Sequence, residues 1–195
     1  MPFKLFVIGA SLGGMSAMQK LLAALPVNLK AAVVLLLHRD SESDKTLVWL
    51  LQKNCALPVV EPGDKDPLLP GRVYLAPADF HLLINQESFS LSMEEPVRYA
   101  RPSIDVLFES AADSFGERTT AVILSGSGND GAIGMAAIKK NAGFTIVQDP
   151  ETAECPLMPQ AAIAAHAVDY IMPLDEIGPF LADIAGGRYG DSSCK

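Results

Sequence analysis

Two patterns of apolar residues take turns along the chain. Short, almost uninterrupted apolar runs cover residues 3–8 and 31–37, as expected for strands buried on both faces of a parallel sheet. Between them, apolar residues recur at helical spacing from Met15 to Leu25, and Pro26 follows where this helix should end. Strands that alternate with helices in this way predict an α/β fold.

The alternation resumes after a middle region rich in proline and glycine. There, the strand-like runs at 73–76 and 81–84 predict an antiparallel hairpin or a small insertion at the sheet edge. The other expected elements are helices at 47–51 (capped by Ser41 or Ser43), 103–114, 131–140, 159–166 and 174–184, and strands at 120–124, 144–147 and 169–171. The whole predicts one doubly wound, Rossmann-like three-layer α/β domain over residues 1–185. It should have a mostly parallel sheet, helices on both faces and a flexible tail at 186–195.

Composition narrows the classes of protein that fit. With 195 residues, 49% of them hydrophobic and 19% charged, the chain suits one compact domain. A net charge of −8 argues against nucleic acid or an anionic membrane as a partner. We expect neither a membrane span nor a signal peptide. The 3 cysteines are odd in number and lack metal-binding spacing, so we expect no metal and a cytoplasmic location. We also expect no cofactor.

The first expected strand ends in Gly9-Ala10-Ser11-Leu12-Gly13, directly before a helix. A serine between two glycines at such a junction is typical of a nucleophile elbow, which holds the hydroxyl clear of the backbone. The helix N-terminus beside it favours a negatively charged oxygen. The glycines also suit a dinucleotide-binding fingerprint, but Ser11 replaces its second glycine and the expected acid comes late, at Asp40. A plain Ser-Gly turn is the third interpretation.

Two further candidates also follow expected strands. His38 comes directly after residues 31–37, and Asp130 lies in a glycine-rich segment after residues 120–124. Because parallel strands end at one edge of the sheet, Ser11, His38 and Asp130 should meet there. Histidine can take the proton of an attacking serine, and a carboxylate on its other ring nitrogen fixes the tautomer. The sequence therefore predicts a Ser-His-Asp triad.

Alternatives stay open at each of these positions. His81, at the start of a strand-like run, competes with His38 as the base and could line the same cleft. Asp130 could simply cap the helix that follows it, since aspartate is common at that position. Asp40 and Asp105 are the alternative acids.

Six segments, in this order, resemble the catalytic domain of the chemotaxis receptor methylesterase family, CheB. They are residues 8–14, the strand ending at His38, and residues 69–81, 101–108, 124–132 and 158–159. Together they span most of the chain up to about residue 177, and their fixed order makes the resemblance specific.

The resemblance implies hydrolysis of glutamate γ-methyl esters on the cytoplasmic helices of methylated chemoreceptors, with glutamine deamidation as a second activity. It implies that Ser11 is the nucleophile, His38 the general base and Asp130 the orienting acid. The backbone N–H groups of Leu12 and Ser127 would form the oxyanion hole. No cofactor is implied.

The chain also departs from the family pattern. Leu12 stands where the family usually has threonine, Ser127 where it has methionine, and Ala100 where histidine commonly precedes Arg101. These changes affect pocket shape and substrate choice rather than the triad. Met1 lies only a few residues before the first strand, so we expect no N-terminal receiver domain. Regulation would then come from a separate receiver or kinase-system protein, or the chain would act alone.

Arginines near the expected site could offset the repulsion between this acidic protein and an acidic helical substrate. Arg39, Arg98 and Arg101 should form a local basic docking patch, although Arg39 and Arg101 also suit an ordinary surface role. The expected substrate-side residues are Arg39, His81, Arg101 and Met158. Two other functions stay open: a serine esterase or amidase with another substrate, and a catalytically silent signalling module with the same fold.

Overall fold

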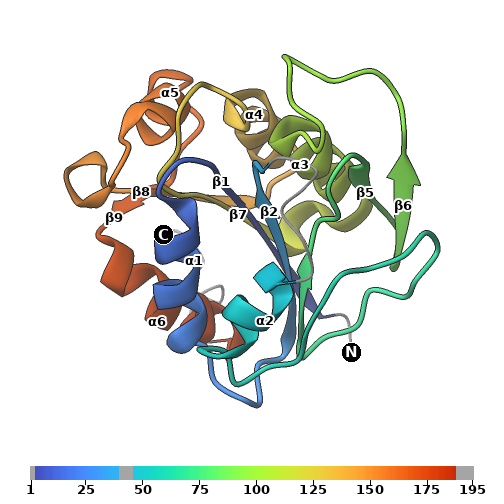
Figure 1. The fold of residues 1–195 in the computed structure, drawn as a ribbon. Coiled ribbons are helices and arrows are strands. Elements are labelled where there is room, and N and C mark those ends of the chain that lie inside the picture. Colours follow the sequence, from blue (N-terminus) through green and yellow to red (C-terminus); the bar gives the residue numbers. More distant parts are fainter. Residues whose placement is uncertain (1–2, 40–45, 188–195) are drawn as a thin grey trace.

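A seven-stranded parallel sheet forms the centre of the molecule (Figure 1). The structure is a computed structural model and describes residues 3–39 and 46–187. The strand order is β3-β4-β2-β1-β7-β8-β9. The bounds are β1 (Lys4–Ala10), β2 (Ala31–Leu37), β3 (Val59–Val60), β4 (Arg72–Leu75), β7 (Thr119–Ile123), β8 (Phe144–Gln148) and β9 (Tyr170–Met172). The expected α/β fold class is confirmed.

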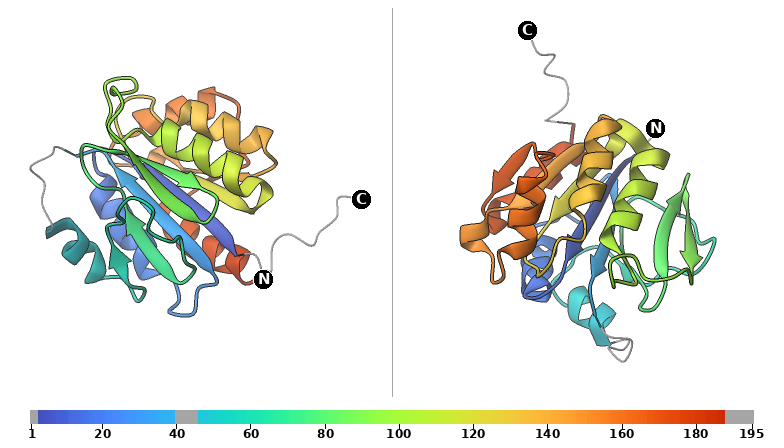
Figure 2. Two further views of the ribbon diagram at one scale, coloured as in Figure 1. Left: turned by 90° about the vertical axis from the view of Figure 1, so that its right-hand side faces the viewer. Right: turned by 90° about the horizontal axis from the view of Figure 1, so that it is seen from above.

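Helices cover both faces of this sheet (Figure 2). One face carries α1 (Gly14–Ala23), α2 (Thr46–Gln52) and α6 (Leu174–Ala185). The other carries α3 (Ile104–Phe115), α4 (Ala132–Lys140) and α5 (Leu157–Ala164), and short 3-10 turns lie at Gly116–Arg118 and Pro150–Thr152. Along β1, Phe6 and Ile8 enter the first core while Leu5 and Val7 enter the second. This two-sided burial explains the continuous apolar runs that predicted the strands.

The antiparallel hairpin exists, but the expected pairing of residues 73–76 with 81–84 is wrong. β4 lies in the main sheet, parallel to β2, whereas β5 (His81–Asn85) pairs with β6 (Ser88–Ser92) and packs on α3. β4 belongs in the main sheet because its residues 73–75 are all buried. The signal for β6 was the alternation of serine with Phe89 and Leu91, a strand with one buried face.

Three sequence expectations fall outside the described residues. They are the helix cap at Ser41 or Ser43, the alternative acid Asp40, and the part of the expected tail beyond residue 187.

The direction in which strands are added to the sheet reverses beside β1. The chain builds outward from β1 through β2 to β4, then returns to place β7 on the other side of β1. In open α/β sheets, such a reversal opens a crevice at the carboxyl ends of the strands. Ser11 follows β1 at this edge and His38 follows β2, while the segment after β7 leads to Asp130.

Candidate active site

Backbone hydrogen bonds fix the chain where β1, β2 and β7 end. Ala10 pairs with Leu37 in the parallel register, so Ser11 and His38 leave neighbouring strands at the same level. The His38 N–H donates to the carbonyl of Ala10 at 3.0 Å. On the other side, the Ser11 N–H donates to the carbonyl of Ser125, also at 3.0 Å. The sheet thus brings the predicted nucleophile and base to one place.

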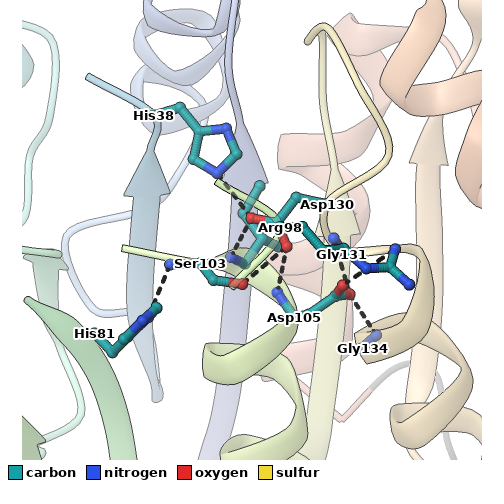
Figure 3. A network of polar contacts seen from close by, with 9 residues as sticks. His38, His81, Arg98, Ser103, Asp105, Asp130, Gly131 and Gly134 are labelled. Atoms are coloured by element: carbon teal, nitrogen blue, oxygen red, sulfur yellow. Dashed lines mark hydrogen bonds and ion pairs between the residues drawn. The ribbon is translucent and has the colours of Figure 1, made fainter. Parts of the chain in front are cut away.

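The predicted acid reaches His38 directly (Figure 3). His38 Nε2 lies 2.8 Å from Asp130 Oδ2, and the two side chains are 22% and 6% exposed. Asp130 accepts three more hydrogen bonds: from the Ser103 hydroxyl at 3.0 Å, the Ile104 N–H at 2.7 Å and the Asp105 N–H at 2.9 Å. A carboxylate with this many donors is held in one orientation, with one oxygen facing the imidazole.

The donors around Asp130 come from the N-terminus of α3. The first N–H groups of a helix have no partner within it, and their partial positive charge favours an anion. Burial opposes the charged form of Asp130. Hydrogen bonds from His38 and from the N–H groups of Asp105 and Ile104 outweigh it, so the pKa of Asp130 lies below the usual aspartate value. Asp130 is therefore an ionised partner for His38 at neutral pH.

Asp130 does not cap the helix that follows it, which was the structural alternative. In the described chain, α4 begins after Gly131, and its N-terminal N–H groups donate to Asp105 instead. Asp105 Oδ1 accepts from Gly131 at 2.9 Å and from Gly134 at 2.7 Å. The two helices thus exchange carboxylates. Asp130, which precedes α4, accepts from N–H groups at the N-terminus of α3, and Asp105, in α3, accepts from N–H groups at the N-terminus of α4 (Figure 3).

Asp105 is not placed as the triad acid, because its carboxylate accepts from the N-terminus of α4 while His38 contacts Asp130. Asp105 Oδ2 lies 3.9 Å from Arg98 Nη1 and has no hydrogen-bond partner among the described residues. Burial raises the pKa of Asp105, the Gly134 N–H opposes the rise, and the charge of Asp130 adds to it. Arg98, expected in a docking patch, points toward this buried carboxylate (Figure 3).

Two of the expected substrate-side residues are buried. His81 is 2% exposed; its Nδ1 accepts from the Ser103 N–H at 3.3 Å and its Nε2 lies 3.2 Å from the Glu95 carbonyl. Met158 is 1% exposed and packs so closely on Gly126 that a Cβ there would lie 2.5 Å from the Met158 methyl group. Their placement gives both side chains a supporting role behind the site.

The N–H groups expected to form the oxyanion hole are both available. Leu12 and Ser127 are exposed, and no hydrogen bond among the described residues uses either N–H. Ser125, which the sequence analysis missed, connects the two segments. Its hydroxyl donates to the Leu12 carbonyl at 2.8 Å and accepts from the Cys155 N–H at 2.9 Å. A serine in a glycine-rich segment after a strand was the signal for this link.

A cavity of about 550 Å³ opens beside His38. Its lining is formed by His38, Arg39, Asp79 and residues 99–102. Arg39 and Arg101 of the expected docking patch therefore reach the site, and Arg98 is not part of the lining. The sequence analysis missed Asp79 and Tyr99, because loop residues carry no periodic pattern.

The described residues offer neither a metal-binding cluster nor a membrane-spanning helix. No group of three or more histidine, cysteine, aspartate or glutamate side chains could hold a metal ion there. Within the same residues, every helix is too short or too polar to cross a bilayer.

Comparisons with known proteins point to one family. The family model described as CheB methylesterase matches residues 6–181. A Leptospira interrogans protein, named for protein-glutamate methylesterase and protein-glutamine glutaminase activities, is 42% identical over 178 residues, covering 91% of this chain and 92% of that protein. A Carboxydothermus hydrogenoformans protein named for the same activities is 39% identical over 92% of this chain, which spans 54% of its length. The crystal structure of the Thermotoga maritima CheB methylesterase catalytic domain matches 94% of this chain with a TM-score of 0.91 and 32% identity.

Proposed function

The chain belongs to the CheB methylesterase family, and we propose on that basis that it hydrolyses glutamate γ-methyl esters on methylated chemoreceptors to glutamate and methanol. The family resemblance expected from the sequence is confirmed. The observation that carries the proposal is the His38–Asp130 pair, 2.8 Å apart, at the strand edge where Ser11 also emerges.

The orientation of the imidazole supports the following proposal for the proton transfers. Nε2 faces the ionised Asp130, so the neutral ring carries its hydrogen on Nε2 and leaves Nδ1 as the base for Ser11. Ser11 Oγ attacks the ester carbonyl as its proton passes to Nδ1. The imidazolium that forms is stabilised by Asp130, which keeps its own charge.

Collapse of the tetrahedral intermediate and hydrolysis of the acyl-enzyme complete the proposed reaction. Its oxyanion accepts hydrogen bonds from the N–H groups of Leu12 and Ser127, each worth about 3 kcal/mol in such sites. Methanol leaves with the proton from His38 Nδ1, and an acyl-enzyme remains on Ser11. Water then attacks the acyl group as its proton passes to Nδ1, and His38 returns that proton to Ser11 Oγ when the acyl–oxygen bond breaks. The glutamic acid released loses its own proton to solvent and becomes glutamate.

Deamidation of glutamine follows from the same chemistry as a second activity. The relatives are named for glutaminase activity as well as methylesterase activity. An amide carbonyl forms the same acyl-enzyme, with ammonia as the leaving group in place of methanol. His38 would protonate the departing nitrogen, as it protonates methoxide.

A protein substrate suits the setting of the cavity, which is open and bordered by the fully exposed Tyr99. The identity of the receptor, a receiver or kinase-system partner and a cytoplasmic location stay predictions. A serine hydrolase with another substrate is the competing proposal, because Leu12 and Ser127 border the reacting centre.

Methanol release from a methyl-labelled chemoreceptor tests the proposal, with the wild-type protein compared with Ser11→Ala. We expect release by the wild type and none above background by the variant. Ser16→Ala, on the exposed side of α1, is the matched control and should retain full activity. Release that persists in Ser11→Ala would exclude Ser11 as nucleophile. If the wild type neither released methanol nor reacted with a serine-directed probe, the silent signalling module would be favoured. Reaction with the probe without methanol release would favour a hydrolase with another substrate.

A further inference from the structure

The cavity beside His38 is lined by charged side chains that take no part in the proposed triad chemistry. Besides His38 it is lined by two arginines, Asp79 and a short loop that ends in Pro102. The cavity therefore adjoins the proposed base and adds charged groups that could contact a substrate. The charge balance within it depends on how each arginine is bound.

Arg39 is held mainly by the protein itself. Its side chain is 7% exposed, and its Nη2 donates to Glu61 Oε2 at 3.0 Å and to the Ala76 carbonyl at 3.2 Å. The Glu61 carboxylate opposes the guanidinium charge at this distance. Arg39 therefore forms a wall of the cavity and attracts an anion less strongly than an arginine without a carboxylate partner.

Arg101 is bound differently. Its Nη1 donates to the carbonyls of Met93 and Glu94, each at 3.2 Å, which fixes the guanidinium through neutral groups. Within the described residues no carboxylate lies at ion-pair distance from the Arg101 guanidinium. A guanidinium held by carbonyls keeps its positive charge and its remaining donors for a ligand.

The turn beside Arg101 carries backbone strain. Val97 and Ala100 exchange backbone hydrogen bonds of 3.1 and 2.9 Å, and both residues at the tip, Arg98 and Tyr99, have positive φ values of 49° and 67°. Glycine or asparagine normally fills such positions, since other side chains are sterically strained there. Strain of this kind is concentrated at functional sites.

The turn directs its two tip side chains, those of Arg98 and Tyr99, to opposite environments. Arg98 turns inward to Asp105, 3.9 Å away, while the Tyr99 side chain is held fully in solvent at the rim of the cavity. An exposed aromatic ring next to an available guanidinium is typical of a surface that binds another protein.

We propose that this cavity is a subsite for an acidic side chain of the substrate protein, located near the esterified glutamate, with Arg101 as its cation and Tyr99 as an apolar contact. The inference rests on the proposed methylesterase function and adds a selectivity to it. The protein as a whole carries a net charge of −8, so it repels acidic partners unless a local cation attracts them. Arg101 supplies that cation beside the catalytic base.

Paired peptides test this selectivity. Each is a helical peptide with one glutamate γ-methyl ester, and the pair differs by one neighbouring residue, glutamate or glutamine, placed in turn at each position up to four residues away. Methanol release gives kcat and KM for each. We expect the wild type to prefer the glutamate peptide by about tenfold at one or more positions, mainly through KM.

Two variants separate charge recognition from a structural effect. Arg101→Gln should lose the preference because only the glutamate peptide becomes a poorer substrate; a structural defect would slow both peptides equally. Asp79→Asn should strengthen the preference, because it removes a negative charge from the lining. Asparagine suits the positive φ of 62° at this position, so the variant should fold normally.

The outcomes distinguish this inference from the proposed function. Hydrolysis of both peptides by the wild type without preference, or a preference that survives Arg101→Gln, would overturn the subsite alone. An unchanged preference in Asp79→Asn would also count against it. If the wild type cleaved a simple nitrophenyl ester through Ser11 but neither peptide, the proposed substrate class and the subsite would both be wrong.

Discussion

Asp130→Asn tests the carboxylate exchange between the two helices most directly. The substitution keeps the shape of the side chain but replaces one acceptor oxygen by an NH₂ group that only donates. In the wild type each oxygen accepts twice, Oδ1 from Ser103 and Asp105, and Oδ2 from His38 and Ile104. Whichever way the amide turns, two donors therefore face the new NH₂ group.

The structure favours one orientation of the asparagine. An NH₂ group toward Ser103 is tolerated, because the hydroxyl can turn and accept, but the buried N–H of Asp105 then loses its acceptor. An unsatisfied buried N–H costs about 1–3 kcal/mol, and the other bonds lose their charge assistance. We expect the free energy of unfolding to fall by about 2–4 kcal/mol at pH 7 in urea denaturation.

The loss should also depend on pH. The pKa of Asp130 is lower in the folded protein than in the unfolded chain, so its stabilisation is present above the unfolded value near 4 and disappears as the pH falls through the folded value. The difference between wild type and variant should be largest near neutral pH and should narrow in acid. Asp149→Asn is the control, since the Asp149 side chain accepts only a cap bond from the Glu151 N–H among the described residues, and asparagine caps equally well.

Activity gives a second measurement on the same variant. In the favoured orientation the asparagine oxygen still accepts from His38, so the tautomer is kept and only the negative charge is lost. We expect kcat for methanol release to fall by about 10² to 10⁴. A variant within about 0.5 kcal/mol of wild-type stability at pH 7, or a difference that does not change with pH, would refute the reasoning.

Two other substitutions probe the same region. Gly131→Ala should lower the free energy of unfolding by at least about 2 kcal/mol in urea denaturation, because φ is 97° and the new Cβ would lie 2.5 Å from Ile123 Cδ1; a wild-type midpoint would contradict this. Asp105→Asn should be less harmful at pH 7 than at pH 3, opposite in sign to Asp130→Asn. The pKa of Asp105 is raised, so the contribution of the wild-type carboxyl is present in acid and lost as the pH rises through the folded value. Urea unfolding across this range checks the sign, and a loss that grew with pH would contradict it.

Local sequence patterns determined most of the secondary structure and the candidate triad. Apolar runs such as residues 31–37 identified the central strands, because a strand buried on both faces needs apolar side chains throughout. The positions of Ser11, His38 and Asp130 at strand ends predicted that they would meet, since parallel strands share one carboxyl edge. The six matching segments, in order, then indicated the family.

Strand pairing and the partners of buried polar groups were decided only by the tertiary structure. The sequence predicted a hairpin or a small edge insertion for the run at 73–76, because strand propensity does not specify which strand lies next to it. His81 and Met158 were expected on the substrate side, yet packing buried both. The sequence left open that Asp130 caps its own helix, but its carboxylate accepts from the N-terminus of α3, which is distant in sequence.

The difference between these two groups of results has one physical cause. Periodicity and turn chemistry act between residues a few positions apart, so the sequence alone fixes helices, strands and the edge at which they end. Hydrogen bonds of buried carboxylates and the lining of a cavity depend on segments that meet only after folding. The exchange between Asp130 and Asp105, and the Arg101 guanidinium beside His38, therefore became visible only in three dimensions.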